Sequence, residues 1–287
     1  MQWEKAKNLM IVFFLAANIL LAAVNRNEAV SYQLTREREA AIQTVFHNND
    51  ITLYHPIPVQ FSPMRALLLS GQDYDIERLK KIFFPLYAAP EHIQDVMRDV
   101  FIWEDMRLTI SGDYVFFVSG LGITGVPDLD AAIKLTQDFI DAYYPEFIID
   151  IQSTRQARRG GLRIFYRQVY QNKIIHTNYI EFLITGEADD VVIEEVDIRY
   201  NRPIGPAYMP RELVGPDEAL LTFMQYIRSR SYEPILIRYM DIVYLQQPAG
   251  LRENNITLYS YAEPFYRIFI EGLDEPFLIN AYTNRML

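Results

Sequence analysis

A glycine-rich motif is the first feature of the sequence that could bind a cofactor. Residues 120–125, Gly-Leu-Gly-Ile-Thr-Gly, match the G-x-G-x-x-G pattern that holds the pyrophosphate of a dinucleotide, and they follow an apolar run at 114–118. In that fold the helix begins within the motif, so that its N-terminus meets the phosphate. Here Pro127-Asp128 marks a helix start after the last glycine. We therefore predict a loop between domains at 120–125 and no dinucleotide site.

The histidines and carboxylates show no catalytic pattern. His176 and Glu181 lie on a predicted strand, where their odd separation directs the two side chains to opposite faces. A cluster of carboxylates lacks the spacing of a calcium-binding loop, and we expect it to be a solvated turn. These carboxylates are Glu187, Asp189, Asp190, Glu194 and Glu195. The sequence also has no nucleophile elbow, zinc-protease motif or phosphate-binding loop. We predict that the protein is not an enzyme and has no catalytic residue, cofactor or metal.

One compact basic patch, Arg158-Arg159-Gly160-Gly161, falls in a predicted turn and could contact anionic lipid or a cell-wall polymer. The formal net charge of −10 opposes such contacts and disfavours nucleic acid as a partner. The chain contains no cysteine, which excludes disulfides, thiolate nucleophiles and cysteine-ligated metal centres. Binding and contact functions therefore remain, and redox or thiol chemistry does not.

The N-terminal segment has the composition of a membrane span. The run from Leu9 to Val24 carries no charge, and a helix of this length covers about 24 Å of the roughly 30 Å hydrocarbon core of a bilayer. Trp3, Lys5 and Lys7 precede the run and extend the helix into the interface, where such side chains anchor it. The end of the run lacks the paired small residues of a signal-peptidase site. We predict an uncleaved single-pass helix; a cleaved signal peptide and a buried helix of a soluble protein are the alternatives.

Asn18 is the polar residue within this run. A carboxamide in the bilayer core is costly unless a partner satisfies it, and Ala22 and Asn25 lie at i+4 and i+7 on the same helical face. This face could seat a helix of another protein; an asparagine satisfied by its own backbone is the alternative. We predict a cytoplasmic tail at 1–7 and a transmembrane helix at 8–25, in contact with membrane lipid. The remainder of the chain is expected outside the cytoplasm.

The exported part is predicted to be α+β, with antiparallel sheets that are each packed by helices. The chain is 50% hydrophobic and 14% aromatic, which excludes a disordered polypeptide. Helical patterns occupy 30–46, 76–84 and 92–101. Ser111-Gly112-Asp113 between two apolar runs predicts a hairpin. We assign these elements to a membrane-proximal unit at 30–124.

The rest of the sequence has the pattern of an internal duplication. Acidic helix starts at Asp130 and Glu218 are each followed by aromatic and β-branched runs. Both copies contain Phe-Tyr-Arg, at 165–167 and 265–267, before a turn and a return strand. Each copy is therefore expected to be a helix laid across an antiparallel sheet. The predicted units are repeat 1 at 125–205 and repeat 2 at 206–287, joined by a proline-rich connector at 202–216.

The N-terminus resembles a known family. Met1, Trp3, Lys5 and Lys7, followed by Ile11-Val12-Phe13-Phe14-Leu15 and Asn18, are similar to the YycI family of Gram-positive bacteria, single-pass membrane proteins that regulate the essential sensor histidine kinase YycG (WalK). The length, the lack of cysteine and an α+β exterior are similar along the whole chain. Gln2 stands where members usually carry an acidic residue.

This resemblance implies a regulator without enzymatic activity. Its membrane helix would associate with the helices of the kinase and of the sister protein YycH, while the exported domains modulate the sensory domain of the kinase. Carried over residue by residue, it assigns membrane anchoring or helix contacts to Trp3, Lys5, Lys7 and Asn18. Two alternatives remain from the sequence: an anchored module that binds a ligand or cell-wall polymer, and a secreted hydrolase with a composite carboxylate site.

Overall fold

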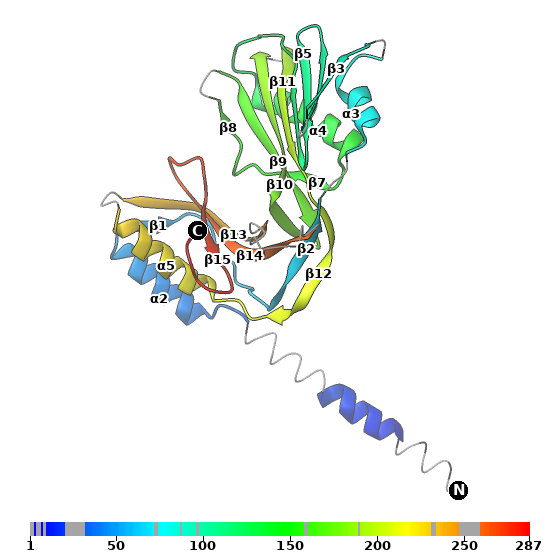
Figure 1. Ribbon diagram of the computed structural model, residues 1–287. Helices are drawn as coiled ribbons and strands as arrows, with labels where there is room; N and C mark the ends of the chain where they lie inside the picture. Colours follow the sequence, from blue (N-terminus) through cyan, green and yellow to red (C-terminus); the bar gives the residue numbers. More distant parts are fainter. Residues whose placement is uncertain are drawn as a thin grey trace.

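The fold has two lobes, and a strand of one lobe pairs with a strand of the other at one junction (Figure 1). The computed structural model describes residues 3, 7, 10–20, 32–71, 74–86, 88–95, 98–157, 160–188, 190–230, 234–246 and 259–287. We call residues 74–200 the continuous lobe, because they follow one another in the chain. Residues 32–71 and 202–287 form the split lobe, because its two parts are separated by the continuous lobe. The fold is mixed α+β, with a large and mostly antiparallel sheet.

The split lobe packs two helices on one curved sheet. The strand order is β12-β2-β14-β13; β1 adds to β13 in parallel, and β15 adds to β14. Arg38 on α2 forms a bidentate ion pair with Asp217 on α5, at 2.7 and 2.8 Å, which links the two helices. The elements are α2 (Arg36–His47), β1 (Ile51–Leu53), β2 (Met64–Ser70), β12 (Arg202–Arg211), α5 (Pro216–Arg228), β13 (Ile235–Gln246), β14 (Tyr259–Ile270) and β15 (Phe277–Asn280).

The continuous lobe is an antiparallel sheet with helices α3 and α4 on one face. Its strand order is β3-β4-β5-β6-β11-β10-β9, and both β7 and β8 pair with β9. The elements are α3 (Ile76–Phe83), β3 (Glu91–Gln94), β4 (Asp99–Trp103), β5 (Met106–Ser111), β6 (Tyr114–Val118), α4 (Leu129–Tyr143), β7 (Phe147–Ile149), β8 (Arg155–Gln156), β9 (Leu162–Tyr170), β10 (Lys173–Glu187) and β11 (Asp190–Arg199).

Local sequence explains the two long helices that cover these sheets. The Asp128 carboxylate caps α4 by accepting from the amides of residues 130 and 131, and Pro216 opens α5 where its missing amide costs nothing. The buried residues of α4 are spaced four apart, at Ala132, Thr136 and Ile140, so one stripe faces the sheet. These starts agree with the acidic first turns predicted from the sequence. Each helix buries its stripe in a separate hydrophobic core.

The two lobes repeat one order and one register. Apart from the two-residue strand β8 between β7 and β9, the order is the same: α4 is followed by β7, β9 and β10 in the continuous lobe, and α5 by β13, β14 and β15 in the split lobe. Tyr166 lies opposite Ile149 and Ile180, while Tyr266 lies opposite Ile242 and Ile279. Both tyrosines are fully buried. The Phe-Tyr-Arg triplets that the sequence singled out therefore occupy equivalent places in the two sheets.

A distortion in β10 joins the two sheets. The register of β10 shifts between Ile175 and Tyr179, and at Ile175 the strand, still paired with Gln168 of β9, also pairs in parallel with Tyr244 of β13. A bulge of this kind bends a strand sharply. The lobes are thus connected through backbone pairing as well as through the chain crossings at 71–74 and 200–202.

Two predicted segments have a different structure. The segment 92–101, predicted as a helix, instead contains β3 and β4, and His92 stacks on Phe101 across the pair with ring centroids 4.4 Å apart. The proline-rich connector at 202–216 contains the strand β12, which pairs with β2. Proline is tolerated in β12 because this strand lies at the edge of the sheet, where missing amides cost least.

Strand pairing divides the chain differently from the predicted units. β2, placed in a unit at 30–124, pairs with β12 and β14 of the C-terminal part. β6, from the same predicted unit, pairs instead with β11. The predicted boundary between 205 and 206 falls inside β12. The predicted hairpin around Gly112 is present as β5 and β6. Among the described residues, no helix is both long enough and apolar enough to cross a bilayer.

Candidate functional site

The predicted anchoring residues lie partly outside the described chain. Lys5, Ala22 and Asn25 are not among the described residues. Trp3, Lys7 and Asn18 are described; all three have exposed side chains, with Trp3 80% accessible. The structure therefore brings none of the three described residues to either lobe.

The helical segment 10–20 exposes large apolar side chains. Phe13 and Phe14 are 70% and 59% accessible, and their rings contact each other in an edge-on arrangement. Contiguous exposed apolar surface of this kind is typical of segments that contact a membrane or another protein. The other apolar residues exposed on the segment are Met10, Ile11, Val12, Leu15, Ile19 and Leu20.

The glycine-rich segment 120–125 is a loop between β6 and α4 inside the continuous lobe, so it does not separate domains as predicted. The Glu194 carboxylate accepts hydrogen bonds from the Ser119 hydroxyl at 2.9 Å and the Gly122 amide at 3.3 Å. A side-chain carboxylate from β11 thus satisfies this hydroxyl and this backbone amide of the loop. Gly125 has a φ of 133°, and a Cβ there would lie 2.4 Å from the carbonyl of Gly186, so close packing explains this glycine.

The other polar residues singled out from the sequence do not form one site. His176 is half-buried at the junction, while Glu181 pairs with Arg163 on the uncovered face of the continuous lobe. Glu195 shares that arginine at 3.3 Å. Arg158, Arg159 and Asp189 lie outside the described residues. Within the described ranges, no group of three or more His, Asp or Glu side chains is placed to hold a metal ion.

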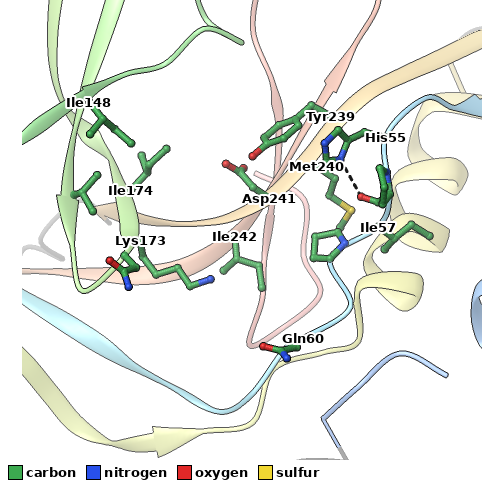
Figure 2. A pocket seen from close by; sticks show the side chains of 14 residues that line it. His55, Ile57, Gln60, Ile148, Lys173, Ile174, Tyr239, Met240, Asp241 and Ile242 are labelled. Carbon is green, nitrogen blue, oxygen red and sulfur yellow. Dashed lines mark hydrogen bonds between the residues drawn. The ribbon is translucent and has the colours of Figure 1, made fainter.

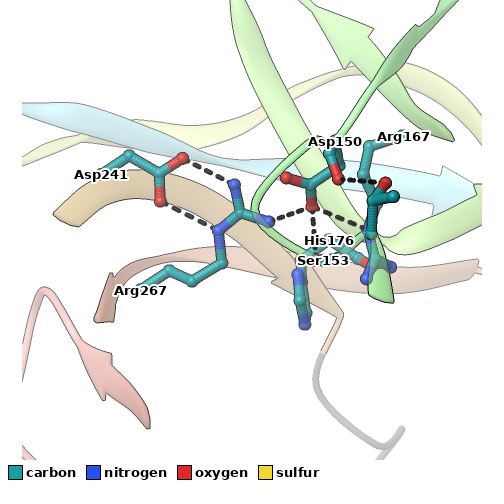
Figure 3. Close-up of polar contacts among 7 residues, drawn as sticks. Asp150, Ser153, Arg167, His176, Asp241 and Arg267 are labelled. Atoms are coloured by element: carbon teal, nitrogen blue, oxygen red, sulfur yellow. Dashed lines mark hydrogen bonds and ion pairs between the residues drawn. The ribbon is translucent and has the colours of Figure 1, made fainter. Parts of the chain in front are cut away.

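A buried ionic network lies where the lobes meet (Figure 3). Arg267 on β14 donates from Nε and Nη2 to the two carboxylate oxygens of Asp241 on β13, at 2.9 and 2.7 Å, and from Nη1 to Asp150, at 2.5 Å. Asp150 follows β7 of the continuous lobe, so this contact crosses between the lobes. Arg267 and Asp150 are 1% and 3% accessible. Water therefore screens the pair little, and its geometry determines its strength.

Asp150 also collects partners from its own lobe. The Arg167 guanidinium lies 3.4 Å from the carboxylate, and the Ser153 hydroxyl donates to it at 2.9 Å. Arg167 also donates to the backbone carbonyl of His176. Two carboxylates and two guanidiniums thus balance in charge. The repeated arginines of the two Phe-Tyr-Arg triplets meet at a single aspartate.

The two arginines differ in electrostatic environment. Burial opposes the charge of Arg267, but hydrogen bonds and charge from Asp241 and Asp150 outweigh it, and the pKa of Arg267 is raised. Burial dominates at Arg167 and lowers its pKa, with Asp150 as partial compensation. Burial, followed by the charges of Arg167 and Arg267, also lowers the pKa of His176 well below its usual range. His176 is therefore neutral at physiological pH.

A second polar network, made of side-chain amides, lies beside the ionic network and also connects the lobes. The Asn178 side chain donates to Gln168 and to the carbonyl of Asn201, both at 2.6 Å. Asn201 in turn donates to Asp113 and to Gln246 of the split lobe, both at 3.1 Å. Asn178 and Asn201 are buried, and satisfied buried amides fix one arrangement of the strands they connect. The lobes are consequently connected by buried hydrogen bonds as well as by the ionic network.

An open groove of about 730 Å³ lies between the lobes next to the ionic network (Figure 2). Its floor is residues 239–242 of β13, and its walls are the chain at 55–60 on one side and the start of β10 on the other. Figure 2 shows Ile148 and Ile174 across the groove from His55, with Asp241 and Lys173 between them. The volume falls in the range of roughly 300 to 1,000 Å³ typical of ligand sites.

Two polar side chains of the groove, Asp241 and His55, have partners within the fold. Asp241 faces the groove with both oxygens already held by Arg267, and the ring of His55 rests against Tyr239 with centroids 4.9 Å apart. No serine or threonine is among the residues that line the groove.

Sequence reasoning noted the Phe-Tyr-Arg triplets but did not identify their arginines as junction residues. A signal was present, because an arginine inside an apolar strand must find a partner when buried. Asp150 and Asp241 could not be assigned as those partners from sequence, since pairing depends on which strands face each other.

Comparisons with known proteins support the fold. No family model matches the sequence, and no curated protein matches it significantly. The crystal structure of an uncharacterized protein from Eubacterium rectale ATCC 33656 aligns with a TM-score of 0.52 at 10% identity, over 82% of this chain and 88% of that chain. The Bacillus megaterium YpeB C-terminal domain aligns with a TM-score of 0.45 at 9% identity, over 76% and 96% of the two chains. The first likeness shows a shared fold.

Proposed function

We propose that the chain is a membrane-anchored regulator of the YycI kind. In this proposal it modulates a YycG/WalK-type sensor histidine kinase, together with a YycH-like partner, through contacts of its membrane helix and its extracytoplasmic lobes. It has no enzymatic activity, and its location is the cell membrane with a cytoplasmic N-terminus. Nucleic acid is not a partner.

The observation that carries this proposal is the apolar N-terminal segment. The uncharged run from Leu9 to Val24 follows Trp3, Lys5 and Lys7, and the described helical residues 10–20 expose their apolar side chains. Such a segment needs a lipid or protein environment. Residues 8–25 are therefore proposed as the transmembrane helix, with Asn18, Ala22 and Asn25 on the face toward a partner helix.

The exported lobes support a binding role. Matching order and register around Tyr166 and Tyr266 favour the proposal that the two lobes arose by internal duplication. Buried ionic and amide networks join the lobes and give a stable surface for contact with another domain. A regulator must bind the signalling states of its kinase with different affinity, because equal affinity would leave their populations unchanged.

Replacing Asn18 tests the helix contact. Asn18→Leu in the full-length chain should weaken association with the kinase membrane helices in a two-component membrane assay by about 3- to 30-fold, equivalent to the roughly 0.6 to 2 kcal/mol of one interhelical hydrogen bond. Ala16→Leu, about half a helical turn away on the opposite face, is the matched control and should change association little. Equal effects of the two substitutions would remove Asn18 from the interface.

Crosslinking tests the proposal as a whole. Full-length protein crosslinked in native membranes should be recovered with the kinase and the YycH-like protein. Recovery of a mature chain that is freely soluble and cut near residue 24 would contradict the anchor, and with it the regulator.

The groove between the lobes favours a second candidate function, an anchored module that binds a ligand or cell-wall polymer. Its size and mixed lining are typical of ligand sites. Calorimetric titration of the full chain in detergent with purified wall glycans distinguishes the two. Saturable binding that Lys173→Glu alters would favour this second candidate.

A further inference from the structure

The floor of the groove is a strand edge that the fold leaves open. On the side of β13 away from β14, β1 pairs only as far as Ile237, and β10 pairs only at Tyr244. No strand of the described chain pairs with that edge between these two positions. The open stretch coincides with the groove residues 239–242.

The register identifies which backbone groups face the groove. Tyr244 lies opposite Pro264, which has no N–H and whose carbonyl accepts from the amide of Ala281, just after β15. Tyr244 and Pro264 therefore form a non-hydrogen-bonded pair, and such pairs alternate with bonded ones along an antiparallel ladder. By this alternation Asp241 and Val243 bond to β14. The N–H and C=O groups of Met240 and Ile242 point toward the groove.

Two prolines prevent the chain itself from closing this edge. The register of Ile51 with Ile235 and of Leu53 with Ile237 would, if continued, place residues 56 and 58 beside Met240 and Ile242. Pro56 and Pro58 stand at those places and cannot donate to a ladder. The chain instead diverges after Tyr54 and forms the opposite wall of the groove. An open edge of this kind pairs readily with another strand unless it is blocked.

The side chains around the edge define what could enter. Ile148, Ile174 and Ile57 supply apolar walls, and Figure 2 shows the Lys173 side chain lying along the groove beside Ile242. Within the described chain, no carboxylate forms an ion pair with Lys173, and both oxygens of the nearby Asp241 are held by Arg267. Lys173 also lines an adjoining hollow of about 410 Å³ that contains Arg65. The unpaired charge at this end of the groove is positive.

We propose that this groove binds an extended peptide segment of a partner polypeptide, which adds to β13 as a strand. Met240 and Ile242 exchange backbone hydrogen bonds with it, its apolar side chains contact Ile148 and Ile174, and an acidic residue meets Lys173. A polypeptide is favoured over a hydrocarbon because evenly spaced N–H and C=O groups are matched by another backbone and by no acyl chain. This inference does not depend on the identity of the kinase or on the membrane helix.

A tethered peptide tests the proposal in the full-length protein. Since the chain has no cysteine, Gln60→Cys at the groove rim provides a single attachment site. The probe is the acetylated peptide Glu-Val-Thr-Val-Thr-Cys, joined by a disulfide so that its local concentration is about millimolar. Hydrogen exchange at single-amide resolution, by mass spectrometry in detergent, then reports on Met240 and Ile242, with Asp241 and Val243 as internal references.

In the untethered protein Met240 and Ile242 should exchange faster than Asp241 and Val243. The tethered peptide should slow the first two at least tenfold and leave the references unchanged. The same peptide N-methylated at alternate residues should give no protection, because it cannot complete the ladder. A version that begins with Lys should protect less. Lys173→Glu should reverse this preference, while Lys134→Glu, the same charge change on the exposed face of α4, should not.

Three results would overturn the proposal. Equally slow exchange at all four amides of the free protein would mean that the edge is already paired. Protection by the N-methylated peptide, or by a tethered decyl chain, would mean that the groove is covered without strand pairing. No protection by the unmethylated peptide would mean that the groove does not accept a strand. The regulator proposal would survive each of these outcomes, because the Asn18 and crosslinking tests do not involve the groove.

Discussion

The two lobes use the same tripeptide at the same register for two different tasks. In each lobe the tyrosine of Phe-Tyr-Arg is fully buried beneath the helix, where Tyr166 bonds Thr136 of α4 and Tyr266 bonds the carbonyl of Val214 just before α5. The arginines differ more. Arg267 is held by two carboxylates, whereas Arg167 has one carboxylate at 3.4 Å, a carbonyl, and the rings of Phe165 and Tyr179.

The contacts of the tyrosine are common to both lobes, whereas the partners of the arginine are set by the junction between the lobes. The tyrosine closes the core of each lobe, so its environment is similar in both. The arginine faces the other lobe, so its partners depend on how the lobes meet. Because Asp150 accepts from both arginines, the two triplets are linked through a residue that belongs to neither.

The strongest test of this asymmetry exchanges each arginine for methionine. Arg267→Met leaves Asp241 and Asp150 buried without their main partner and should cost about 3–5 kcal/mol of unfolding free energy. Arg167→Met should cost less than half as much, because Asp150 keeps Arg267 and Ser153. Urea unfolding of the full-length variants in detergent measures both. Equal losses would show that the two arginines are equivalent and would break the comparison.

Removing the tyrosine hydroxyls tests the hydrogen bond that the buried tyrosine makes in each lobe. Tyr266→Phe removes the bond of 2.5 Å to the carbonyl of Val214 and should cost about 1–3 kcal/mol, since that acceptor loses a buried donor. Tyr166→Phe should cost about 0.5–1.5 kcal/mol, because the Thr136 hydroxyl also donates within α4. The same urea assay applies. A larger loss at Tyr166 would contradict the assigned partners.

A carboxylate on the uncovered face of the continuous lobe gives a smaller, pH-dependent effect. Burial, then the charge of Glu181, raises the pKa of Asp197 from 3.8 to about 6. The ionised form therefore destabilises the fold above about pH 6, and this penalty disappears as the pH falls toward 3.8. Asp197→Asn should raise the urea midpoint at pH 8 and change it little near pH 4. A gain that persists near pH 4 would assign it to another cause.

The exposed ion pair between the lobes should contribute least to the free energy of unfolding. Arg155 on β8 and Glu275 after β14 form an ion pair at 3.1 Å, with Glu275 78% accessible. Surface pairs of this kind contribute about 0–1 kcal/mol and are screened by salt. Glu275→Gln should therefore leave the urea midpoint nearly unchanged, and any difference should vanish in 1 M salt. A large loss would mean that the outer contact, and not the buried network, joins the lobes.

Elements with local signals were predictable from the sequence, and those defined by distant partners were not. The hairpin around Gly112 and the helix after Asp128 follow from turn and cap residues that act within a few positions. β12 was missed because its prolines indicate a connector, and only its edge position makes them acceptable. The 92–101 segment was assigned to a helix because short apolar runs fit both periods.

The candidate site was predictable only in part. The triplet that ends in Arg267 is visible in the sequence, but its link to Asp150 spans 117 positions and depends on how two lobes dock. The open edge of β13 is defined by the absence of a neighbouring strand within the described chain, which no pattern within 239–242 encodes. Pro56 and Pro58 acquire their meaning only once the register of β1 is known.

The interrupted order of the split lobe constrains how the polypeptide acquires its structure during synthesis. The apolar strand β2 emerges early, yet both of its neighbours, β12 and β14, come from the last third of the chain. The continuous lobe contains all its own strands, so it can fold while β2 remains unpaired. A chain truncated before residue 202 would therefore contain one folded lobe and an unpaired, apolar strand β2. Such a truncated chain would be a substrate for quality-control proteases.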